Sequence, residues 1–271
     1  MSITFSTCWY SLKAKFPETT YLEWMDNLLS SVHRYFLVLY TDQQNYTYFF
    51  SKYGKNKNIK IVIRPFEEFY MMQHKDFWIQ NHGKNTLLNK RVDWEVNMLW
   101  SEKVHFVENT RVSEYFPPTD WYGWIDIGYF RCRSGQDITK EMLWDFPKPQ
   151  ILNQFNPHKI HYALVNPNLS YIYSLMNLIQ HSDQSIPDNQ ISIGGGCFIA
   201  PENKVEQWKN TYTAKLEEYI REGRLVKDDQ IILADCIFRD IGLQNFELHF
   251  DERVSPYKFD IWFTFAYLLT L

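Results

Sequence analysis

Residues 121–131 read WYGWIDIGYFR, and this stretch decides the fold class. An aromatic run of high β propensity ends at one carboxylate, Asp126, and Gly128 follows it closely. A buried strand that carries an acid at its C-terminal end places charge where open α/β sheets bind ligands. Arg131 and Arg133 come next, and a guanidinium group matches the oxygens of a phosphate. The same pattern also fits an ordinary strand end followed by solvated arginines.

Composition narrows the class of protein. The chain has 271 residues, of which 45% are hydrophobic and 18% aromatic, so it can bury a sizeable core. Its formal net charge of −4 gives no basic footprint, and we expect no nucleic-acid partner. The sequence contains no repeat, low-complexity tract or linker, and one continuous domain over residues 1–271 is therefore favoured.

The cysteines and the two chain ends bear on the compartment. Cys8, Cys132, Cys197 and Cys236 are far apart and form no Cys-x-x-Cys pair, which favours a reducing compartment. No secretory signal is visible, so we expect a cytoplasmic protein without a transmembrane segment. The last 11 residues are strongly apolar but shorter than the roughly 20 that span a bilayer. A buried element is favoured there, and peripheral membrane contact is the alternative.

Short apolar runs alternate with amphipathic segments along the first third of the chain. Strands are predicted at residues 3–8, 35–40 and 59–63, with a helix from Thr19 or Thr20 to Ser30 and another at residues 45–52. Parallel strands need crossover connections, usually helical ones. This alternation therefore predicts an α/β fold with a mixed, mostly parallel central sheet and helices on both faces.

The remaining elements follow from the same periodicity. We expect one long helix at residues 91–108, the strand at 121, and a loop-rich region at 136–168 around a single strand at 151–155. Further on, the sequence predicts a helix at 169–180, a strand at 191–200 that glycines interrupt, a helix from Pro201 to about 222, a helix from Asp228 or Asp229 to 238, and a strand at 246–250.

Two groups of residues at these predicted element ends could carry chemistry. Gly194, Gly195 and Gly196 lie within an otherwise apolar strand, where glycine marks either the close approach of a ligand or a bulge. Asp228 and Asp229 precede an apolar helix; a helix cap explains one acid, and the other could act as a base or orient a substrate hydroxyl.

Two single residues are weaker candidates. His249 alternates with apolar residues on the last predicted strand, where a lone histidine is more often structural than a ligand. Lys103 lies on the helix before the Asp126 strand, where a lysine is usually solvated. If it lies near the C-terminal end of that strand, it could reach a phosphate as a point charge.

Taken together, these motifs resemble one protein family. LWSEK at 99–103, WIDIGYFR at 124–131, the glycine triplet before a helix containing Trp208, and DDQ at 228–230 occur in the order seen in the HtrL/YibB (WlaTC-type) family of glycan-synthesis proteins. The resemblance covers roughly residues 1–250 in layout, and only these short motifs are specific. It implies a GT-A-like, Rossmann-type glycosyltransferase that transfers a sugar from a nucleotide-diphosphate sugar to a glycan or other hydroxyl acceptor.

The resemblance implies roles for particular residues. Asp126 matches the acid of an Asp-x-Asp-like motif that touches a metal or the donor ribose, but Gly128 stands where many such enzymes have a second acid. Asp229 matches an acid that faces donor and acceptor. His249 is a candidate second metal ligand, and Thr7 matches a nucleotide-contacting strand by position only. The nucleotide part would span about residues 1–135 and the acceptor part about 136–271.

The predicted donor site needs positive charge. Asp126, Arg131, Lys103 and the glycine triplet would face the nucleotide sugar, and a divalent metal would help to neutralise its diphosphate. Manganese accepts carboxylate, imidazole and water ligands together, whereas magnesium prefers oxygen ligands in near-ideal octahedral geometry. We therefore expect manganese to support activity better than magnesium.

Two other functions remain open at the level of sequence. A sugar-phosphate nucleotidyltransferase is one, although the segment after the first strand, STCWY at 6–10, lacks the glycine-rich phosphate loop of that class. A catalytically silent glycan-binding module is the other, and Gly128 in place of an acid is its best support.

Overall fold

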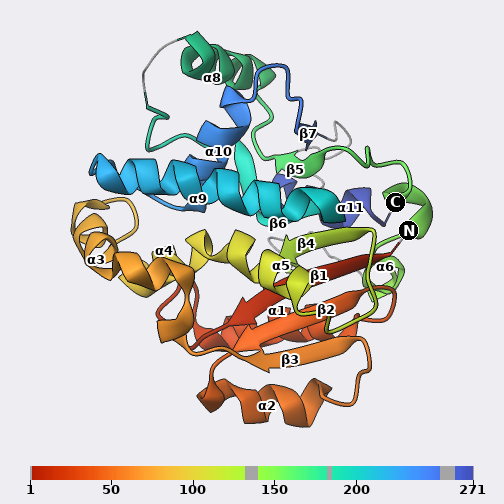
Figure 1. Cartoon of the computed structure of the whole chain (residues 1–271). Coiled ribbons are helices and arrows are strands. Elements are labelled where there is room, and N and C mark those ends of the chain that lie inside the picture. Colours follow the sequence, from red (N-terminus) through yellow and green to blue (C-terminus); the bar gives the residue numbers. More distant parts are fainter. Residues whose placement is uncertain (1, 132–139, 182–184, 251–259, 271) are drawn as a thin grey trace.

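A seven-stranded mixed sheet forms the centre of the protein (Figure 1). The computed structural model describes residues 2–131, 140–181, 185–250 and 260–270. The strands lie in the order β3-β2-β1-β4-β6-β5-β7. Their bounds are β1 Ile3–Trp9, β2 Phe36–Thr41, β3 Ile59–Ile63, β4 Trp121–Ile125, β5 Ile160–Leu164, β6 Ile193–Pro201 and β7 Phe246–His249.

Six of these seven strands run in one direction. β1 pairs in parallel with β2 and β4, β2 with β3, and β5 with β7, whereas β6 is antiparallel to both β4 and β5. The C-terminal ends of β1 and β4 therefore lie beside the N-terminal part of β6. This arrangement brings three segments that are far apart in the sequence to one edge of the sheet.

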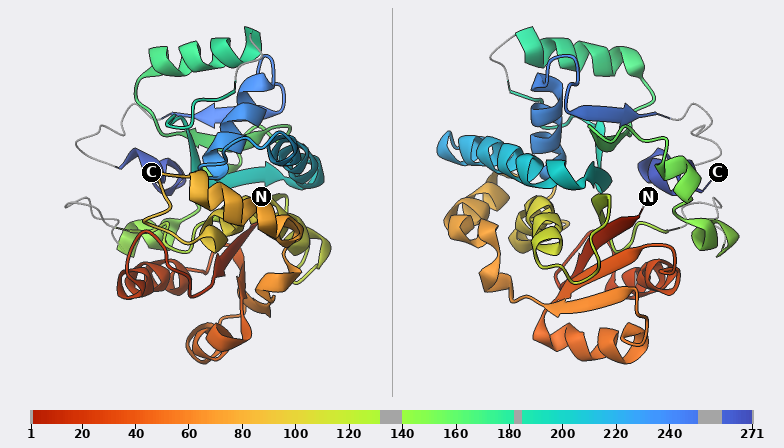
Figure 2. Two further views of the ribbon diagram at one scale, coloured as in Figure 1. Left: turned by 90° about the vertical axis from the view of Figure 1, so that its left-hand side faces the viewer. Right: turned by 45° about the vertical axis from the view of Figure 1, so that its right-hand side comes forward.

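Helices cover both faces of the sheet (Figure 2). Side chains from α4, α5, α8, α9 and α10 contribute to one buried cluster, and side chains from α1, α2 and α11 contribute to the other. The helix bounds are α1 Glu18–Ser30, α2 Gln43–Tyr53, α3 Lys75–Lys84, α4 Trp94–Ser101, α5 Lys103–Val112, α6 Lys140–Asp145, α7 Pro149–Leu152, α8 Leu169–His181, α9 Val205–Arg221, α10 Asp229–Arg239 and α11 Thr264–Leu268, with short 3-10 segments η1 Phe66–Glu68, η2 Tyr70–His74, η3 Glu202–Lys204 and η4 Ile261–Phe263.

Side-chain alternation along the strands explains why two cores form. In β4, Trp121 and Ile125 belong to one buried cluster, whereas Tyr122 and Trp124 belong to the other. A strand covered on both faces is apolar along its whole length, as the sequence of this segment indicates. The predicted α/β class, with a mostly parallel mixed sheet and helices on both faces, is confirmed.

The long helix predicted at residues 91–108 is wrong. The structure ends α4 at Ser101 and begins α5 at Lys103, with the buried Glu102 between them. Glu102 accepts hydrogen bonds from the backbone N–H groups of Tyr70 and Met71. Burial raises the pKa of Glu102 to about 7, although Arg64 and these N–H groups oppose the shift. As a result, Lys103 lies at the beginning of a new helix.

The predicted strand at 151–155 is also wrong. Residues Pro149–Leu152 form the short helix α7, with proline in its first turn, and the strand of this region is β5 at Ile160–Leu164. Proline at the start of a helix loses no backbone hydrogen bond. The β-prone run IHYAL then supplies a strand that is buried along its whole length.

Three smaller differences concern element ends. Neither Thr19 nor Thr20 caps α1, which begins at Glu18 after Pro17. Pro201 ends β6 instead of opening a helix, and η3 precedes α9. The glycine triplet does not interrupt β6, which continues through it.

The apolar C-terminal segment packs inside the protein. Phe263, Phe265, Tyr267 and Leu269 of η4, α11 and the residue after it are buried in the core cluster that includes Trp121. These side chains therefore offer no exposed apolar face for the membrane contact considered above. Within the described residues, no helix is both long and apolar enough to cross a membrane.

Candidate functional site

A cavity of about 360 Å³ opens at the C-terminal ends of β1 and β4. Open α/β sheets bind ligands at such an edge because the loops there diverge. Aromatic side chains, three acids and four cations line the cavity. Its lining includes Trp9, Tyr10, Lys15, Tyr21, Arg91, Trp100, Lys103, Trp124, Asp126, Gly128, Arg131, Gly195, Gly196, Asp228, Asp229 and Phe263.

Asp126 is fixed directly after β4. Its backbone N–H donates to the carbonyl of Gly196 at 2.8 Å, which extends the pairing with β6 by one residue. The indole Nε1 of Trp124 donates to Asp126 Oδ1 at 2.7 Å. The side chain of Asp126 retains 34% of its exposure and faces the cavity. The prediction that an acid follows directly after the C-terminal end of this strand is therefore confirmed.

Lys103 lies between two carboxylates instead of reaching into open space. Its Nζ is 3.1 Å from Asp126 Oδ1 and 2.9 Å from Asp229 Oδ2, and it donates to the carbonyl of Gly195 at 2.7 Å. Burial alone would lower the pKa of Lys103, but Asp126 and Asp229 raise it above its usual value. The side chain is therefore a permanent ammonium group that joins the two acids.

Asp229 is the first residue of α10 and is almost fully buried. Burial raises its pKa to about 6, and the charges of Asp228 and Asp126 act in the same direction, whereas Lys103 opposes them. A carboxyl group with a pKa near the working pH can accept and return a proton. Asp229 thus has the environment of an acid–base residue as well as an ion-pair partner.

Asp228 does not have the capping role that its position suggested. It precedes α10, but its side chain accepts no hydrogen bond from the first turn. Asp228 Oδ2 is 3.5 Å from Lys227 Nζ. Asp228 Oδ1 is buried and accepts no hydrogen bond from a described residue. Asp228 also lines the cavity.

The glycine triplet has two different roles. A Cβ at Gly195 would lie 2.6 Å from Asp229 Oδ2, and one at Gly196 would lie 3.3 Å from Tyr129 and 3.4 Å from Asp126 Oδ2. Both residues line the cavity, and their lack of a side chain admits the acid cluster. Gly194 is different, because a Cβ there would meet Val165 at 2.8 Å. Gly194 packs against Val165 and does not line the cavity where the donor was expected to bind.

Arg131 lines the cavity and lies against two aromatic rings. Its guanidinium carbon lies 4.9 Å from the ring centroid of Trp24 and 5.0 Å from that of Phe263. Gly128 lines the cavity nearby, and a Cβ there would lie 3.1 Å from Trp24. Stacking on aromatic faces fixes a guanidinium group without consuming its charge. Arg133 lies outside the described residues.

Sequence reasoning missed two cations that line the same cavity, Lys15 and Arg91. Lys15 Nζ lies 4.6 Å from the ring centroid of Trp100. Burial lowers the pKa of Lys15, although the charges of Asp228 and Asp229 oppose the shift. Both residues belong to irregular segments that precede helices, so no periodicity singled them out.

Two predicted site residues lie elsewhere. Thr7, predicted by position to contact the nucleotide, is fully buried within β1 and does not line the cavity. His249 is on β7, three strands from β4 in the sheet order, and neighbouring strands are about 4.8 Å apart. It also contacts Phe155 on the sheet face opposite to Trp124. His249 therefore cannot share a metal with Asp126.

The protein groups that remain for a metal in the cavity are few. Asp126 Oδ2 takes part in neither the Trp124 nor the Lys103 contact, and Asp228 Oδ1 is unpaired among the described residues. Within the described residues, the cavity does not bring three histidine or carboxylate ligand atoms within reach of one ion. A metal could bind here through Asp126 only if the diphosphate and water supplied most of its ligands.

Comparison with known proteins adds no assignment, because no protein-family model matches the chain and a search of curated proteins found no similar sequence.

Proposed function

We propose that this cavity binds a nucleotide-diphosphate sugar and that the protein transfers its glycosyl group to a hydroxyl of a glycan or similar acceptor. The observation that carries the proposal is the cluster of Asp126, Lys103 and Asp229 at the sheet edge, beside cations and aromatic walls. Glycosyl transfer requires a group that accepts the proton of the acceptor hydroxyl and charge that stabilises the departing diphosphate.

The cations of the cavity suit a diphosphate. Lys15, Arg91 and Arg131 line it without being part of the Asp126–Lys103–Asp229 cluster. Arginine binds phosphate oxygens through two parallel N–H groups, and lysine binds them as a point charge. Arg131 is already oriented by Trp24 and Phe263, so little conformational entropy is lost when it binds an anion.

Aromatic side chains on the cavity wall suit the other parts of the donor. Trp9, Tyr10, Tyr21 and Trp100 provide flat apolar surfaces on which a base or a sugar ring can stack. Gly195 and Gly196 leave room for the acids, because a Cβ at Gly195 would lie 2.6 Å from Asp229 Oδ2 and one at Gly196 would lie 3.4 Å from Asp126 Oδ2. Both glycines line the cavity together with Asp229, which is the residue that we propose as the base.

A divalent metal, when bound, would add positive charge to the leaving diphosphate. Asp126 Oδ2 is the protein group best placed to hold it, and manganese remains the preferred ion because it accepts mixed ligands. Lys103 already supplies one fixed positive charge between Asp126 and Asp229. We therefore propose that metal assists this chemistry. Lys103, Arg131 and Lys15 would neutralise part of the negative charge of the same diphosphate.

One observation favours a second function. Because Lys103 pairs with both Asp126 and Asp229, the acids could simply be neutralised within a site that binds a nucleotide sugar or a glycan and does no chemistry. Both alternatives retain ligand binding in Asp126→Asn. A silent module would release no nucleoside diphosphate even as the wild type, whereas a transferase would release it as the wild type and lose that turnover in Asp126→Asn.

A thermal-shift screen with UDP, GDP, CDP and ADP, each with and without manganese, tests the donor site. A ligand at 100 times its Kd adds about 2.7 kcal/mol to the free energy of unfolding. For a chain of this size that raises Tm by about 5–10 °C. The nucleotide that shifts Tm is then supplied as its sugar conjugates, and release of the nucleoside diphosphate is measured with glycan acceptors. No shift with any nucleotide would contradict the proposal.

The matched variant is Arg131→Gln, which keeps a polar side chain but shortens it and removes its charge. It should weaken nucleotide-diphosphate binding about 10-fold, because a charge-assisted contact contributes roughly 1.5–3 kcal/mol. Arg221→Gln, at the exposed C-terminal end of α9 and outside the cavity lining, serves as the control that should bind normally. Equal binding by both variants would remove Arg131 from the site.

A further inference from the structure

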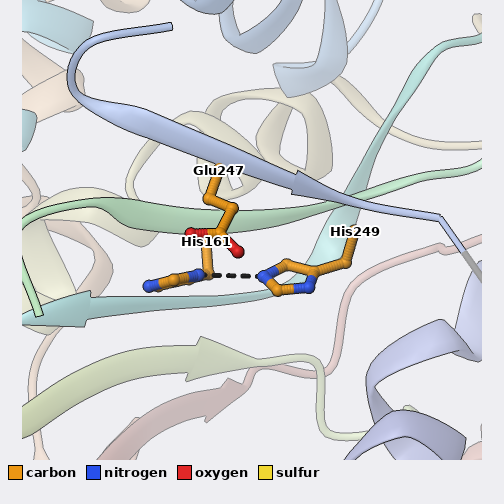
Figure 3. Close-up of side chains that lie close together, drawn as sticks. All are labelled: His161, Glu247 and His249. Atoms are coloured by element: carbon orange, nitrogen blue, oxygen red, sulfur yellow. Dashed lines mark hydrogen bonds between the residues drawn. The ribbon is translucent and has the colours of Figure 1, made fainter. Parts of the chain in front are cut away.

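A second cluster of potential ligands lies on the other sheet face, at the edge formed by β5 and β7 (Figure 3). His161 is directly opposite Glu247 in the ladder, and His249 follows two residues later on the same face of β7. One ligand atom from each of the three lies within 4.8 Å of the others, which is the only such group among the described residues.

The hydrogen bonds of the two histidines fix their protons. His161 Nε2 lies 3.0 Å from the carbonyl oxygen of Asn156, which can only accept, so Nε2 carries a hydrogen. In a neutral ring, Nδ1 of His161 is then a lone pair that faces His249 Nε2 at 2.9 Å. A backbone carbonyl on the far nitrogen is the usual device that orients a metal-binding imidazole.

The surroundings hold these rings in place. Phe155 stacks on His249 with ring centroids 4.7 Å apart and on His161 at 4.5 Å, and Trp121 meets His161 edge-on. His161 is fully buried, whereas Glu247 and His249 are half-buried, so the group can be reached from one side. No hydrogen bond or ion pair joins Glu247 to another residue in the described part of the chain.

We propose that His161 Nδ1, His249 Nε2 and the Glu247 carboxylate bind one divalent transition-metal ion, with zinc the best fit, at a site separate from the Asp126 cavity. Zinc takes two imidazoles and a carboxylate readily and leaves its fourth position to water. The proton on His249 Nε2 moves to Nδ1 when the metal binds, so neither imidazole loses a proton overall. Zinc–nitrogen bonds of about 2.0–2.1 Å separate tetrahedral ligands by about 3.3 Å, and the two rings need only move slightly apart.

The expected consequence is a clamp between two strands. The ion would join the edge strand β7 to β5 and hold the contact of His249 with Phe265 of the C-terminal segment. The site does not depend on the proposed transferase activity, because it shares no residue with the cavity.

Cobalt(II) is the probe, because it follows zinc chemistry and reports its coordination through visible absorption. After the full chain is freed of metal with chelator, titration should give one cobalt per chain and an absorption typical of four- or five-coordinate cobalt, which zinc then displaces. Zinc should also raise Tm of the wild-type chain by mass action. Asp126→Asn should keep the same spectrum, which separates this site from the cavity.

Glu247→Gln and His249→Gln are the deciding variants, because both side chains are half-buried and neither change empties a core position. Each should weaken cobalt binding about 100-fold, since even groups that only orient a ligand contribute 10–100-fold. His181→Gln, at the exposed end of α8, is the matched control and should bind as the wild type does. A wild-type chain that binds no cobalt, or a spectrum that survives in both deciding variants, would overturn the proposal.

Discussion

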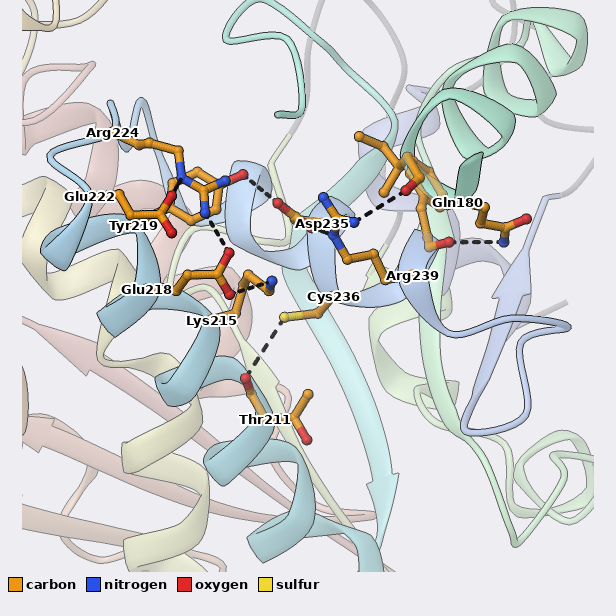
Figure 4. A network of polar contacts seen from close by, with 12 residues as sticks. Gln180, Thr211, Lys215, Glu218, Tyr219, Glu222, Arg224, Asp235, Cys236 and Arg239 are labelled. Carbon is orange, nitrogen blue, oxygen red and sulfur yellow. Dashed lines mark hydrogen bonds and ion pairs between the residues drawn. The ribbon is translucent and has the colours of Figure 1, made fainter. Parts of the chain in front are cut away.

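The acid cluster in the cavity and a second charge network are built from the same residue types in different ways. Figure 4 shows the second network, which lies between α9 and α10. In the network, Asp235 accepts from Tyr219 Oη and from Arg239 Nε, each at 2.5 Å. Glu218 pairs with both Lys215 and Arg224. Every acid of this network pairs with a cation of the same network, so its charges are neutralised internally.

The acids of the cavity cluster are not all paired with a cation of their own. Lys103 serves both Asp126 and Asp229, one oxygen of Asp228 has no partner among the described residues, and Asp126 remains partly exposed to an open volume. Uncompensated buried acids cost stability unless something else binds them. We therefore propose that the network between α9 and α10 stabilises the fold and that the acid cluster of the cavity binds a ligand.

An Asp→Asn substitution in each of the two regions should give the largest difference between them. Asp126→Asn should reduce transfer about 100-fold or more, because it removes a charge beside the reacting groups. Its effect on the free energy of unfolding should stay below about 1 kcal/mol, since Asp126 is partly exposed and Lys103 keeps Asp229. Asp235→Asn should instead cost about 1.5–3 kcal/mol and leave the turnover of the folded enzyme unchanged.

Urea denaturation and release of nucleoside diphosphate measure the two effects on the same preparations. If Asp235→Asn lost turnover and Asp126→Asn lost stability, the assignments of the two regions would be exchanged. Normal turnover in a folded Asp126→Asn variant would remove Asp126 from the mechanism.

The close packing of Gly195 against Asp229 can be tested by adding one methyl group. Gly195→Ala places a Cβ 2.6 Å from Asp229 Oδ2, so Asp229 and Lys103 must shift. Transfer should fall about 10-fold or more, because small displacements at a reacting centre are costly. Gly83→Ala is the matched control: nothing lies within 4 Å of a Cβ there, and alanine in helix α3 should add about 0.5–1 kcal/mol of stability. Full activity of a folded Gly195→Ala variant would show that the close packing of Gly195 against Asp229 is not needed.

The proposed transfer reaction should depend on the divalent metal ion that is supplied. Manganese should raise transfer more than magnesium does, and chelation should reduce it about 10-fold without abolishing it, because Lys103 and Arg131 keep part of the charge. His249→Gln should leave manganese-dependent nucleotide binding unchanged, since His249 lies three strands from β4. Loss of that binding in His249→Gln would mean that the cavity and the β7 edge communicate. Unaltered transfer in excess chelator would remove metal from the reaction.

The sequence predicted those parts of the site that depend on local pattern. The acid after an aromatic strand, Asp126, and the acid that begins an apolar helix, Asp229, lie where element ends placed them. Thr7 and His249 were misplaced because their positions depend on which sheet face a side chain takes and on the strand order. Strand order is set by long-range pairing, which one sequence does not display. Lys15 was missed because it belongs to an irregular segment, and only the folded chain brings it to Trp100.

The stability that the cavity cluster contributes to the fold depends on pH. The pKa of Asp229 is raised to about 6, first by burial and then by Asp228 and Asp126, from a usual value of 3.8. Between these two pH values the folded chain holds more protons at this residue than the unfolded chain does. The contribution of Asp229 to the free energy of unfolding is therefore greatest below about pH 4 and is lost as pH rises through 6.

Urea denaturation of wild type and Asp229→Asn from pH 4 to 8 measures this as a difference between the two chains, which should fall up to about pH 6 and then level off. If Asp229 is the base, kcat/KM should decline below the same pH.

Asp228→Asn provides the sharper test, because the charge of Asp228 helps to raise the pKa of Asp229. That variant should keep transfer activity and move the acidic limb of the profile to lower pH. An unmoved limb would mean that another group sets it, and Asp229 would then be an ion-pair partner of Lys103 and not the base.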